Sequence, residues 1–223
     1  MDRPADVERL SSLDPLISRL RALGEGGRRV MVGLAGAPGA GKSTLAQALV
    51  DRLEAGSAAV VSMDGFHLAA EVIAGTELQA RRGAIDTYDA DGFLHLLRRL
   101  RSADEAVVHA PRYAREIEDP IAAAISVPGH IRYIVVEGNY LLAEPPVWRS
   151  ARAQLDEVWF IDVASELRLS RLVERHVAFG KSRDQALLWS HGSDEVNARL
   201  IDAGRAFADL VINVEDLALL DRD

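Results

Sequence analysis

Eight consecutive residues have the types and the spacing of a phosphate-binding loop. They read Gly36-Ala37-Pro38-Gly39-Ala40-Gly41-Lys42-Ser43, match G-x-x-x-x-G-K-[ST], and are followed by Thr44. Glycines let the backbone curl so that its N–H groups point at phosphate oxygens, which side chains would keep away. Lys42 supplies positive charge for the β- and γ-phosphates, and the Ser43 hydroxyl can ligate Mg²⁺. The pattern therefore predicts that residues 36–44 bind a nucleoside triphosphate.

The segments that flank this loop are those that phosphate binding requires. Residues 29–35 form a short apolar run that is typical of a buried parallel strand. After the loop, apolar residues recur at helical spacing: Leu45, Ala46, Leu49, Val50 and Leu53. The N-terminal end of such a helix is positive and would face the same anion. A glycine-rich turn without a ligand is therefore the weaker interpretation.

Two further apolar segments each end in a carboxylate. Residues 58–63 predict a second buried strand, which ends at Asp64, and residues 131–136 predict a third, which ends at Glu137. Ligands bind at the carboxyl ends of parallel strands. Asp64 is therefore a candidate general base for an acceptor hydroxyl, and Glu137 is a candidate ligand of Mg²⁺ or its waters. For both residues, a capping or turn carboxylate is the structural alternative.

Other polar residues are expected around the same edge of the sheet. His67 follows Asp64 and either contacts the substrate or lies at the rim of the pocket. Asn139 and Tyr140 follow Glu137 at the end of the third strand. We expect both of them to contact the substrate.

A helix predicted over residues 165–179 carries three arginines on its outer face, Arg168, Arg171 and Arg175. An arginine near a phosphate-binding loop can stabilise the charge of the transferring phosphoryl group. We expect this role for Arg171 or Arg175, with ordinary solvent exposure as the alternative. The charged turn over residues 180–184 is a candidate hinge for a lid.

The whole chain is expected to form one α/β domain. Its 223 residues, 48% of them hydrophobic, suffice for one substantial core. Two more strands are predicted, over 157–163 and 209–214, so that five strands alternate with helices as in a parallel sheet. Three segments add to this core: a helical N-terminal extension (1–27), an insertion on the substrate side (65–128) and a lid region (165–200).

The insertion is expected to cover the acceptor side of the site. Residues 68–80 have a weak helical pattern, and Asp89 is the expected N-cap of an amphipathic helix. Two short apolar runs, 107–110 and 121–127, predict a pair of strands that flank a polar loop.

Composition limits the remaining possibilities. Cysteine is absent, which excludes disulfides, thiolate metal sites and cysteine nucleophiles. No apolar run reaches the length of a membrane span and the N-terminus has no signal-peptide pattern, so we expect a cytoplasmic protein without a membrane partner. The net charge of −8 argues against nucleic acid as the main partner, whereas a small-molecule substrate is compatible with it.

In combination, four motifs resemble the phosphoribulokinase, uridine kinase and pantothenate kinase family of P-loop kinases. They are the phosphate-binding loop and residues 63–67 (MDGFH), 82–89 (RGAIDTYD) and 135–142 (VVEGNYLL), in the order that the family has them. Within this family, the chain is similar to small bacterial proteins named as nucleoside/nucleotide kinase-like proteins or fructose transport system kinases. The resemblance covers nearly the whole chain from Val30 onward.

The resemblance implies ATP-dependent transfer of the γ-phosphate to a hydroxyl group of a small molecule, with Mg²⁺. It also implies a fold, the three-layer sandwich of the P-loop NTPases, with a five-stranded parallel sheet of order 2-3-1-4-5 between helices. It supports Asp64 as the base, Glu137 at the metal and the arginines after the fourth strand in a lid.

Three residues of the insertion are candidate substrate contacts by the same resemblance: Arg82, Tyr113 and Arg115. Relatives commonly have an aspartate where this chain has Ala114, so a substrate contact at that position is not carried over. The segment Asn197-Ala198-Arg199 matches one that these small kinases have near the lid, and we expect it on the nucleotide side.

These motifs leave the acceptor open. A sugar such as fructose is the leading candidate, a nucleoside or pantothenate is the alternative, and a non-catalytic ATP-binding regulatory module is the alternative of another class. The sequence argues against a GTPase switch, because neither Lys42 nor Lys181 offers an Asn-Lys-x-Asp guanine site. Without an acceptor we expect only slow ATP hydrolysis, because a closing lid would exclude water. The oligomeric state is open, with a homodimer among the candidates.

Overall fold

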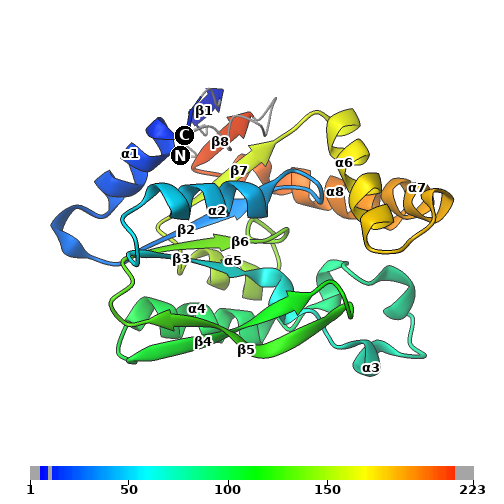
Figure 1. Cartoon of the computed structure of the whole chain (residues 1–223), viewed down its shortest axis with the longest axis horizontal. Coiled ribbons are helices and arrows are strands. Elements are labelled where there is room, and N and C mark those ends of the chain that lie inside the picture. The colour runs from blue at the N-terminus through cyan, green and yellow to red at the C-terminus, as the bar shows by residue number, and fades with distance from the viewer. Residues whose placement is uncertain (1–5, 10–11, 214–223) are drawn as a thin grey trace.

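A six-stranded parallel sheet forms the centre of the molecule (Figure 1). This computed structural model describes residues 6–9 and 12–213. From one edge to the other, the strands are β3 (Ala58–Ser62), β6 (Tyr133–Glu137), β2 (Val30–Ala35), β7 (Glu157–Asp162), β8 (Leu210–Asn213) and β1 (Asp6–Arg9). The first five strands confirm the order 2-3-1-4-5, and β1 adds a sixth strand at the edge beside β8.

The N-terminal extension differs from the helical segment expected over residues 1–27. Its first described residues are the strand β1, which pairs in parallel with β8, and the α-helix α1 covers only Asp14–Leu23. A strand at this place gives the outer main-chain groups of β8 hydrogen-bond partners, which a helix would not. Helical periodicity could not reveal the strand, because its partner lies at the other end of the chain.

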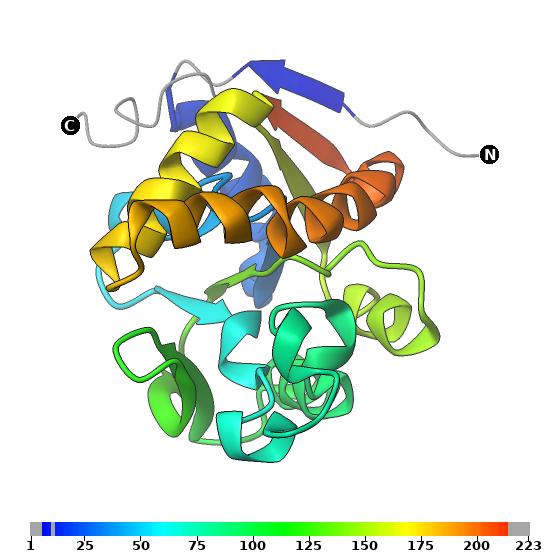
Figure 2. The ribbon, with the colours of Figure 1, turned by 90° about the vertical axis from the view of Figure 1, so that its right-hand side faces the viewer.

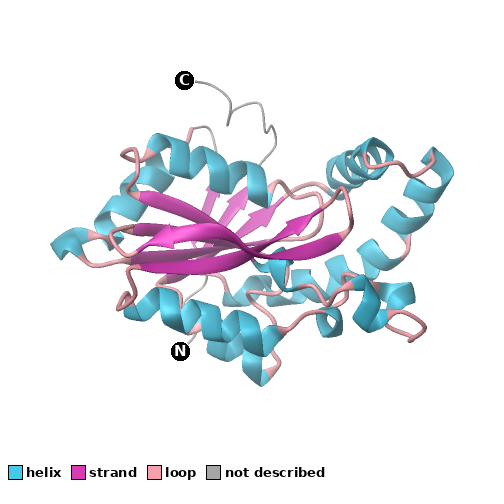
Figure 3. Ribbon diagram, turned by 60° about the horizontal axis from the view of Figure 1, so that its bottom comes forward, coloured by secondary structure: helices cyan, strands magenta, loops and turns pink. Residues whose placement is uncertain are grey.

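Helices cover both faces of the sheet and divide the hydrophobic core in two (Figures 1 and 3). Successive residues of β2 face opposite cores. Val32 packs with α1 and α2 (Lys42–Arg52), and Met31 packs with α4 (Ala90–Ser102) and α5 (Pro146–Arg152). All six residues of β2 are buried, as expected for a central parallel strand between two layers of helices.

The insertion lies below the sheet in the view of Figure 1. The helix expected over residues 68–80 is reduced to α3 (Ala70–Ile73) and a 3-10 turn at Gln79–Arg81. Gly75, with φ of +73°, breaks the helix between them. The helix α4 begins as predicted, because the Asp89 side chain caps it by accepting a hydrogen bond from the Gly92 amide.

The two short strands predicted in the insertion form one long antiparallel hairpin. The strands β4 (Val107–Ala114) and β5 (Asp119–Pro128) continue through most of the expected polar loop, so the prediction of a loop there was wrong. The register shifts between Ala110 and Arg112, which accommodates the intervening proline. Only residues 115–118 remain as a turn.

Three helices form the lid region: α6 (Ser165–Ala178), α7 (Arg183–His191) and α8 (Ser193–Ala203). Figure 2 shows them on one side of the molecule and the insertion on the other. Between α6 and α7, Gly180 has φ of +95°, as a sharp turn at the predicted hinge requires. None of these helices, nor any other helix in the described residues, is long and apolar enough to cross a membrane.

Candidate active site

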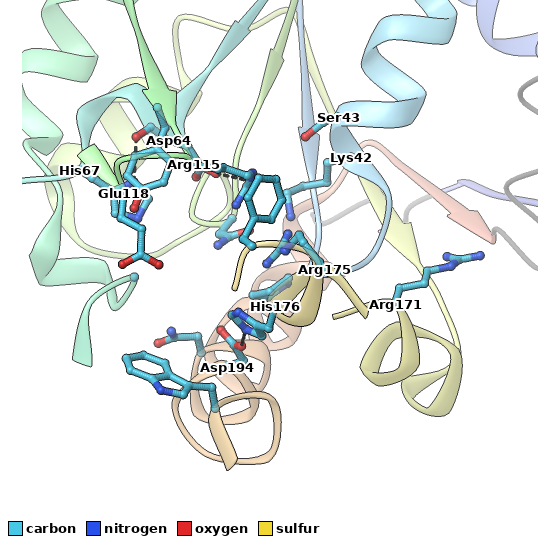
Figure 4. A pocket seen from close by; sticks show the side chains of 18 of the residues that line it. Lys42, Ser43, Asp64, His67, Arg115, Glu118, Arg171, Arg175, His176 and Asp194 are labelled. Carbon is cyan, nitrogen blue, oxygen red and sulfur yellow. Dashed lines mark hydrogen bonds and ion pairs between the residues drawn. The ribbon is translucent and has the colours of Figure 1, made fainter. Parts of the chain in front are cut away.

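A cavity of about 780 Å³ lies between the P-loop, the insertion and the lid (Figure 4). Most of the predicted site residues line it: Pro38, Gly39, Gly41, Lys42, Ser43, Thr44, Asp64, His67, Arg82, Tyr113, Arg115, Glu137, Asn139, Arg171 and Arg175. Four predicted residues do not, namely Gly36, Ala37 and Ala40 within the loop and Tyr140 after β6. Residues far apart in the sequence are thus gathered at the carboxyl ends of β2, β3 and β6.

The P-loop has the backbone that its glycines predict. Gly39 and Gly41 have φ of +83° and +91°, in the left-handed region that favours glycine. Gly41 is the N-cap residue of α2, so the amide groups at the start of this helix face the cavity. A Cβ atom on Gly39 would lie 2.6 Å from the Arg168 carbonyl oxygen, which shows how closely the loop packs against α6.

Lys42 is buried and folds back over the loop. Its Nζ donates hydrogen bonds to the carbonyl oxygens of Gly36, at 2.8 Å, and Ala37, at 3.2 Å. Burial lowers the pKa of Lys42 to about 8, against the opposing effect of the Glu137 and Asp64 charges. An anion held by the loop would stabilise the charged ammonium, so the site is electrostatically suited to phosphate.

Asp64 and Glu137 end two neighbouring strands and both line the cavity. Ser62, not Asp64, caps the 3-10 turn after β3, since its Oγ accepts the hydrogen bond of the Asp64 amide at 3.1 Å. The Asp64 carboxylate instead lies 3.5 Å from the Arg115 guanidinium. Glu137 is the last residue of β6 and is buried, and burial followed by repulsion from Asp64 raises its pKa. Within the described residues neither carboxylate caps a helix, although Asp64 does lie in the 3-10 turn Met63–Phe66.

The oxygen groups around Glu137 fit a magnesium ion. The Ser43 hydroxyl lines the same cavity as the two carboxylates, and such oxygen groups are the ligands that Mg²⁺ takes. Glu137 is buried and is repelled by the partly exposed Asp64, and a divalent cation between them would offset this repulsion. Ser43 and Glu137 are therefore the residues that could hold Mg²⁺.

The three arginines of α6 have three different environments. Arg175 points toward Lys42, whereas Arg171 points away from it (Figure 4). Burial, followed by the charge of Arg115, lowers the pKa of Arg175. Arg168 is 4% exposed, which corrects its expected place on the outer face. It donates a hydrogen bond to the Pro38 carbonyl oxygen at 3.4 Å and forms an ion pair with Glu195, so it ties the lid to the P-loop.

Aromatic rings and paired charges form the acceptor side. The His67 ring contacts Tyr88 and Tyr113, with centroid distances of 4.1 and 4.6 Å and tilts of 42° and 41°, and its Nδ1 lies 2.7 Å from the Asp64 carbonyl oxygen. Arg82 pairs with Asp119 at 2.8 Å. His67 is thus held in the wall beside Asp64, which favours the substrate contact over a place at the outer rim.

Tyr140 and Asn197 differ from their predicted positions. Tyr140 is 1% exposed and lies behind the cavity wall, where its hydroxyl donates a hydrogen bond to the Gly83 carbonyl oxygen at 2.7 Å. Asn197 lines the cavity, and its Nδ2 would lie 4.0 Å from a Cβ on Gly83. Gly83 belongs to the insertion, so Asn197 faces the acceptor side and not the nucleotide side. Arg199 is exposed and does not line the cavity.

Sequence reasoning missed several residues that complete the cavity. Their shared feature is that they lie on the hairpin turn or on the lid: Glu118, His176, Lys181, Trp189 and Asp194. Lys181 connects the lid to the hairpin turn. Its Nζ lies 3.1 Å from Glu118 on the turn and 5.5 Å from the centre of the Trp189 ring on the lid. The one signal in the sequence is the spacing of Asp194 and Asn197, which places two polar side chains on one face of α8.

Comparison with known proteins gives relatives that match nearly the full chain. The candidate uridine kinase C227.14 of Schizosaccharomyces pombe is 31% identical over 217 residues, which cover 93% of this chain and 92% of that protein. The crystal structure of a candidate fructose transport system kinase from Silicibacter sp. TM1040 is 36% identical, with a TM-score of 0.82, over 91% of this chain and 99% of that one.

A more distant structure supports the fold alone. The circularly permuted candidate P-loop kinase YFH7 of Saccharomyces cerevisiae is 19% identical, with a TM-score of 0.77, and the match covers 91% of this chain and 98% of that one. No family model matches the chain. The similarity to the Silicibacter structure, with its TM-score of 0.82 over nearly the whole chain, shows that the two proteins share their overall fold.

Proposed function

The chain belongs to the uridine kinase and pantothenate kinase family of P-loop kinases, and from this premise we propose that it transfers the γ-phosphate of ATP to a hydroxyl group of an uncharged sugar. Fructose is the first candidate, since the full-length structural relative from Silicibacter is named for a fructose transport system. Phosphoryl transfer from ATP is the activity of the family. The sugar acceptor is the part that we propose.

The pairing of the acceptor-side cations carries this proposal. Arg82, Arg115 and Lys181 each have a carboxylate partner, at 2.8 Å (Asp119), 3.5 Å (Asp64) and 3.1 Å (Glu118). An anionic acceptor would have to displace one of these carboxylates to gain an ion pair. A neutral acceptor with several hydroxyl groups can instead hydrogen-bond to carboxylates and guanidinium groups that are already in place.

The proposed mechanism is direct in-line transfer, in which the protein positions the reactants and stabilises charge. Asp64 orients the acceptor hydroxyl and takes its proton, while Lys42 and Arg175 offset the charge of the phosphates. Mg²⁺ held at Ser43 and Glu137 would neutralise the charge that develops on the transferring group. Closure of α6 to α8 over the cavity excludes water, so that ATP is not hydrolysed in place of transfer.

The test is ADP release from Mg-ATP with a panel of acceptors and a blank without acceptor. The panel contains fructose, glucose, ribose, uridine and pantothenate. We expect one of the sugars to exceed the blank by at least about tenfold, since an enclosed site hydrolyses ATP only slowly. Turnover of uridine or pantothenate with inert sugars would overturn the sugar proposal and leave the kinase activity intact.

A nucleoside acceptor is the second candidate, and one observation favours it. Aromatic rings at His67, Tyr88 and Tyr113 line the acceptor side and could stack on a base. These rings already contact one another in tilted pairs, which leaves less of their faces for a base. A regulatory module that binds ATP without turnover would give a flat panel together with measurable ATP binding.

A further inference from the structure

Two lid residues that sequence reasoning did not single out, His176 and Asp194, form a polar pair inside the cavity. We propose that this pair binds acceptor hydroxyl groups other than the one that is phosphorylated, and so selects uncharged polyhydroxylated acceptors. The inference rests on the proposed function, because it needs a sugar-like acceptor in this cavity. It adds the residues that recognise the acceptor from the lid.

The pair joins two lid helices at the cavity surface. His176 is on α6 and Asp194 is at the start of α8, and the His176 Nε2 atom lies 3.0 Å from the Asp194 Oδ2 atom. Each side chain is 17% exposed, and both line the cavity (Figure 4). The exposed part of each side chain is therefore directed at the space that a substrate would fill.

The neighbours of Asp194 place the pair on the acceptor side. Asn197, one helical turn further along α8, reaches Gly83 of the insertion. Tyr140, which donates its hydrogen bond to the Gly83 carbonyl oxygen, has a raised pKa, caused first by burial and then by the charges of Asp64 and Asp194. The negative charges of Asp64, the proposed base, and of Asp194 thus both raise the pKa of Tyr140, which lies behind the acceptor wall.

The free hydrogen-bonding capacity of Asp194 suits hydroxyl groups. A carboxylate offers about four acceptor positions on its two oxygens. Among the described residues, its side chain accepts one hydrogen bond, from His176 to Oδ2, so that Oδ1 remains available. A sugar hydroxyl can donate to this oxygen, whereas a carboxylate or phosphate on the acceptor would be repelled by it.

The test compares Asp194→Asn with Asp104→Asn, an exposed residue that follows α4 and lies outside the cavity. The acceptor is the sugar of highest kcat/KM among fructose, glucose and ribose. In Asp194→Asn we expect its KM to rise by about tenfold with the KM for ATP within about twofold, since a hydrogen bond to a charged group is lost. Asp104→Asn should leave both values unchanged.

Sugars that each lack one hydroxyl group test whether Asp194 contacts the substrate directly or only stabilises the lid. For the hydroxyl that Asp194 binds, removal should raise the KM of the unaltered enzyme by about tenfold and that of Asp194→Asn by less than about twofold. If every analogue raises KM equally in both proteins, the inference is overturned. The His176–Asp194 pair would then serve only to hold α6 and α8 together. Failure of the unaltered enzyme to use any sugar would overturn the proposed function itself.

Discussion

The two halves of the cavity use their positive charges differently. On the nucleotide side, Lys42 and Arg175 make no ion pair with a carboxylate within the described residues. On the acceptor side, Arg82, Arg115 and Lys181 each have such a partner. Unpaired cations suit a ligand that brings its own negative charge, whereas paired cations form a preorganised polar wall for a neutral one.

This difference predicts the largest effect at Arg175, which has no ion-pair partner among the described residues and points toward the P-loop lysine (Figure 4). Arg175→Ala should lower kcat by roughly 10³-fold, in the range of an arginine that stabilises the transferring phosphoryl group. Arg171→Ala is the matched control on the same helix, and it should stay within about threefold because its guanidinium points away from Lys42. Single-turnover kinetics with Mg-ATP and a sugar would measure both. Equal losses would assign the role to both arginines.

The second prediction concerns the proposed base, Asp64, which should be needed for turnover but not for ATP binding. Asp64→Asn should lower kcat by at least about 100-fold while ATP affinity is unchanged, since a general base contributes that much without holding the nucleotide. Calorimetric titration with ATP and a coupled ADP assay give the two values. Asp91→Asn, at an exposed site of α4, controls for the loss of a carboxylate. An unaltered rate in Asp64→Asn would remove it as the base.

The phosphate side of the cavity could be predicted from the sequence more fully than the acceptor side. The phosphate side is made of local patterns, since Gly39, Gly41, Lys42 and Ser43 lie in one loop and each type has a fixed task. Glu137 was also predictable because it ends an apolar strand. The cavity confirms that these residues come together, and the strand order agrees with the resemblance to the family.

The acceptor side could not be predicted in the same way because its contacts are long-range. Lys181 meets Glu118 only because the lid folds over the hairpin turn, and no local pattern encodes that distance. Arg168 appeared to belong to an outer helical face, yet the close approach of Gly39 buries it. The extended hairpin needed the register shift beside Pro111, which depends on pairing and not on propensity.

Removing a carboxylate partner on the acceptor side should make that half of the cavity more favourable to an anionic acceptor. Glu118→Gln removes the partner of Lys181 and leaves that ammonium free for an anion. We expect kcat/KM for an anionic acceptor such as gluconate to rise by about threefold relative to the neutral sugar, a modest effect because the Glu118 side chain is exposed. Glu116→Gln, exposed on the same turn and outside the cavity, is the control. No change in this ratio would show that pairing of Lys181 does not set acceptor charge.

The smallest effect is expected behind the acceptor wall, at Tyr140. Tyr140→Phe keeps the ring packed against Tyr88 and Trp148 but removes the hydrogen bond to the Gly83 carbonyl oxygen. Its loss should cost about 1 kcal/mol of unfolding free energy, which lowers Tm by roughly 2–4 °C for a chain of this size. Because Tyr140 does not line the cavity, the KM for the sugar should change by no more than about twofold. A large rise in that KM with an unaltered Tm would place the hydroxyl in the substrate site, as the sequence predicted, and would move the boundary of the acceptor side inward to β6.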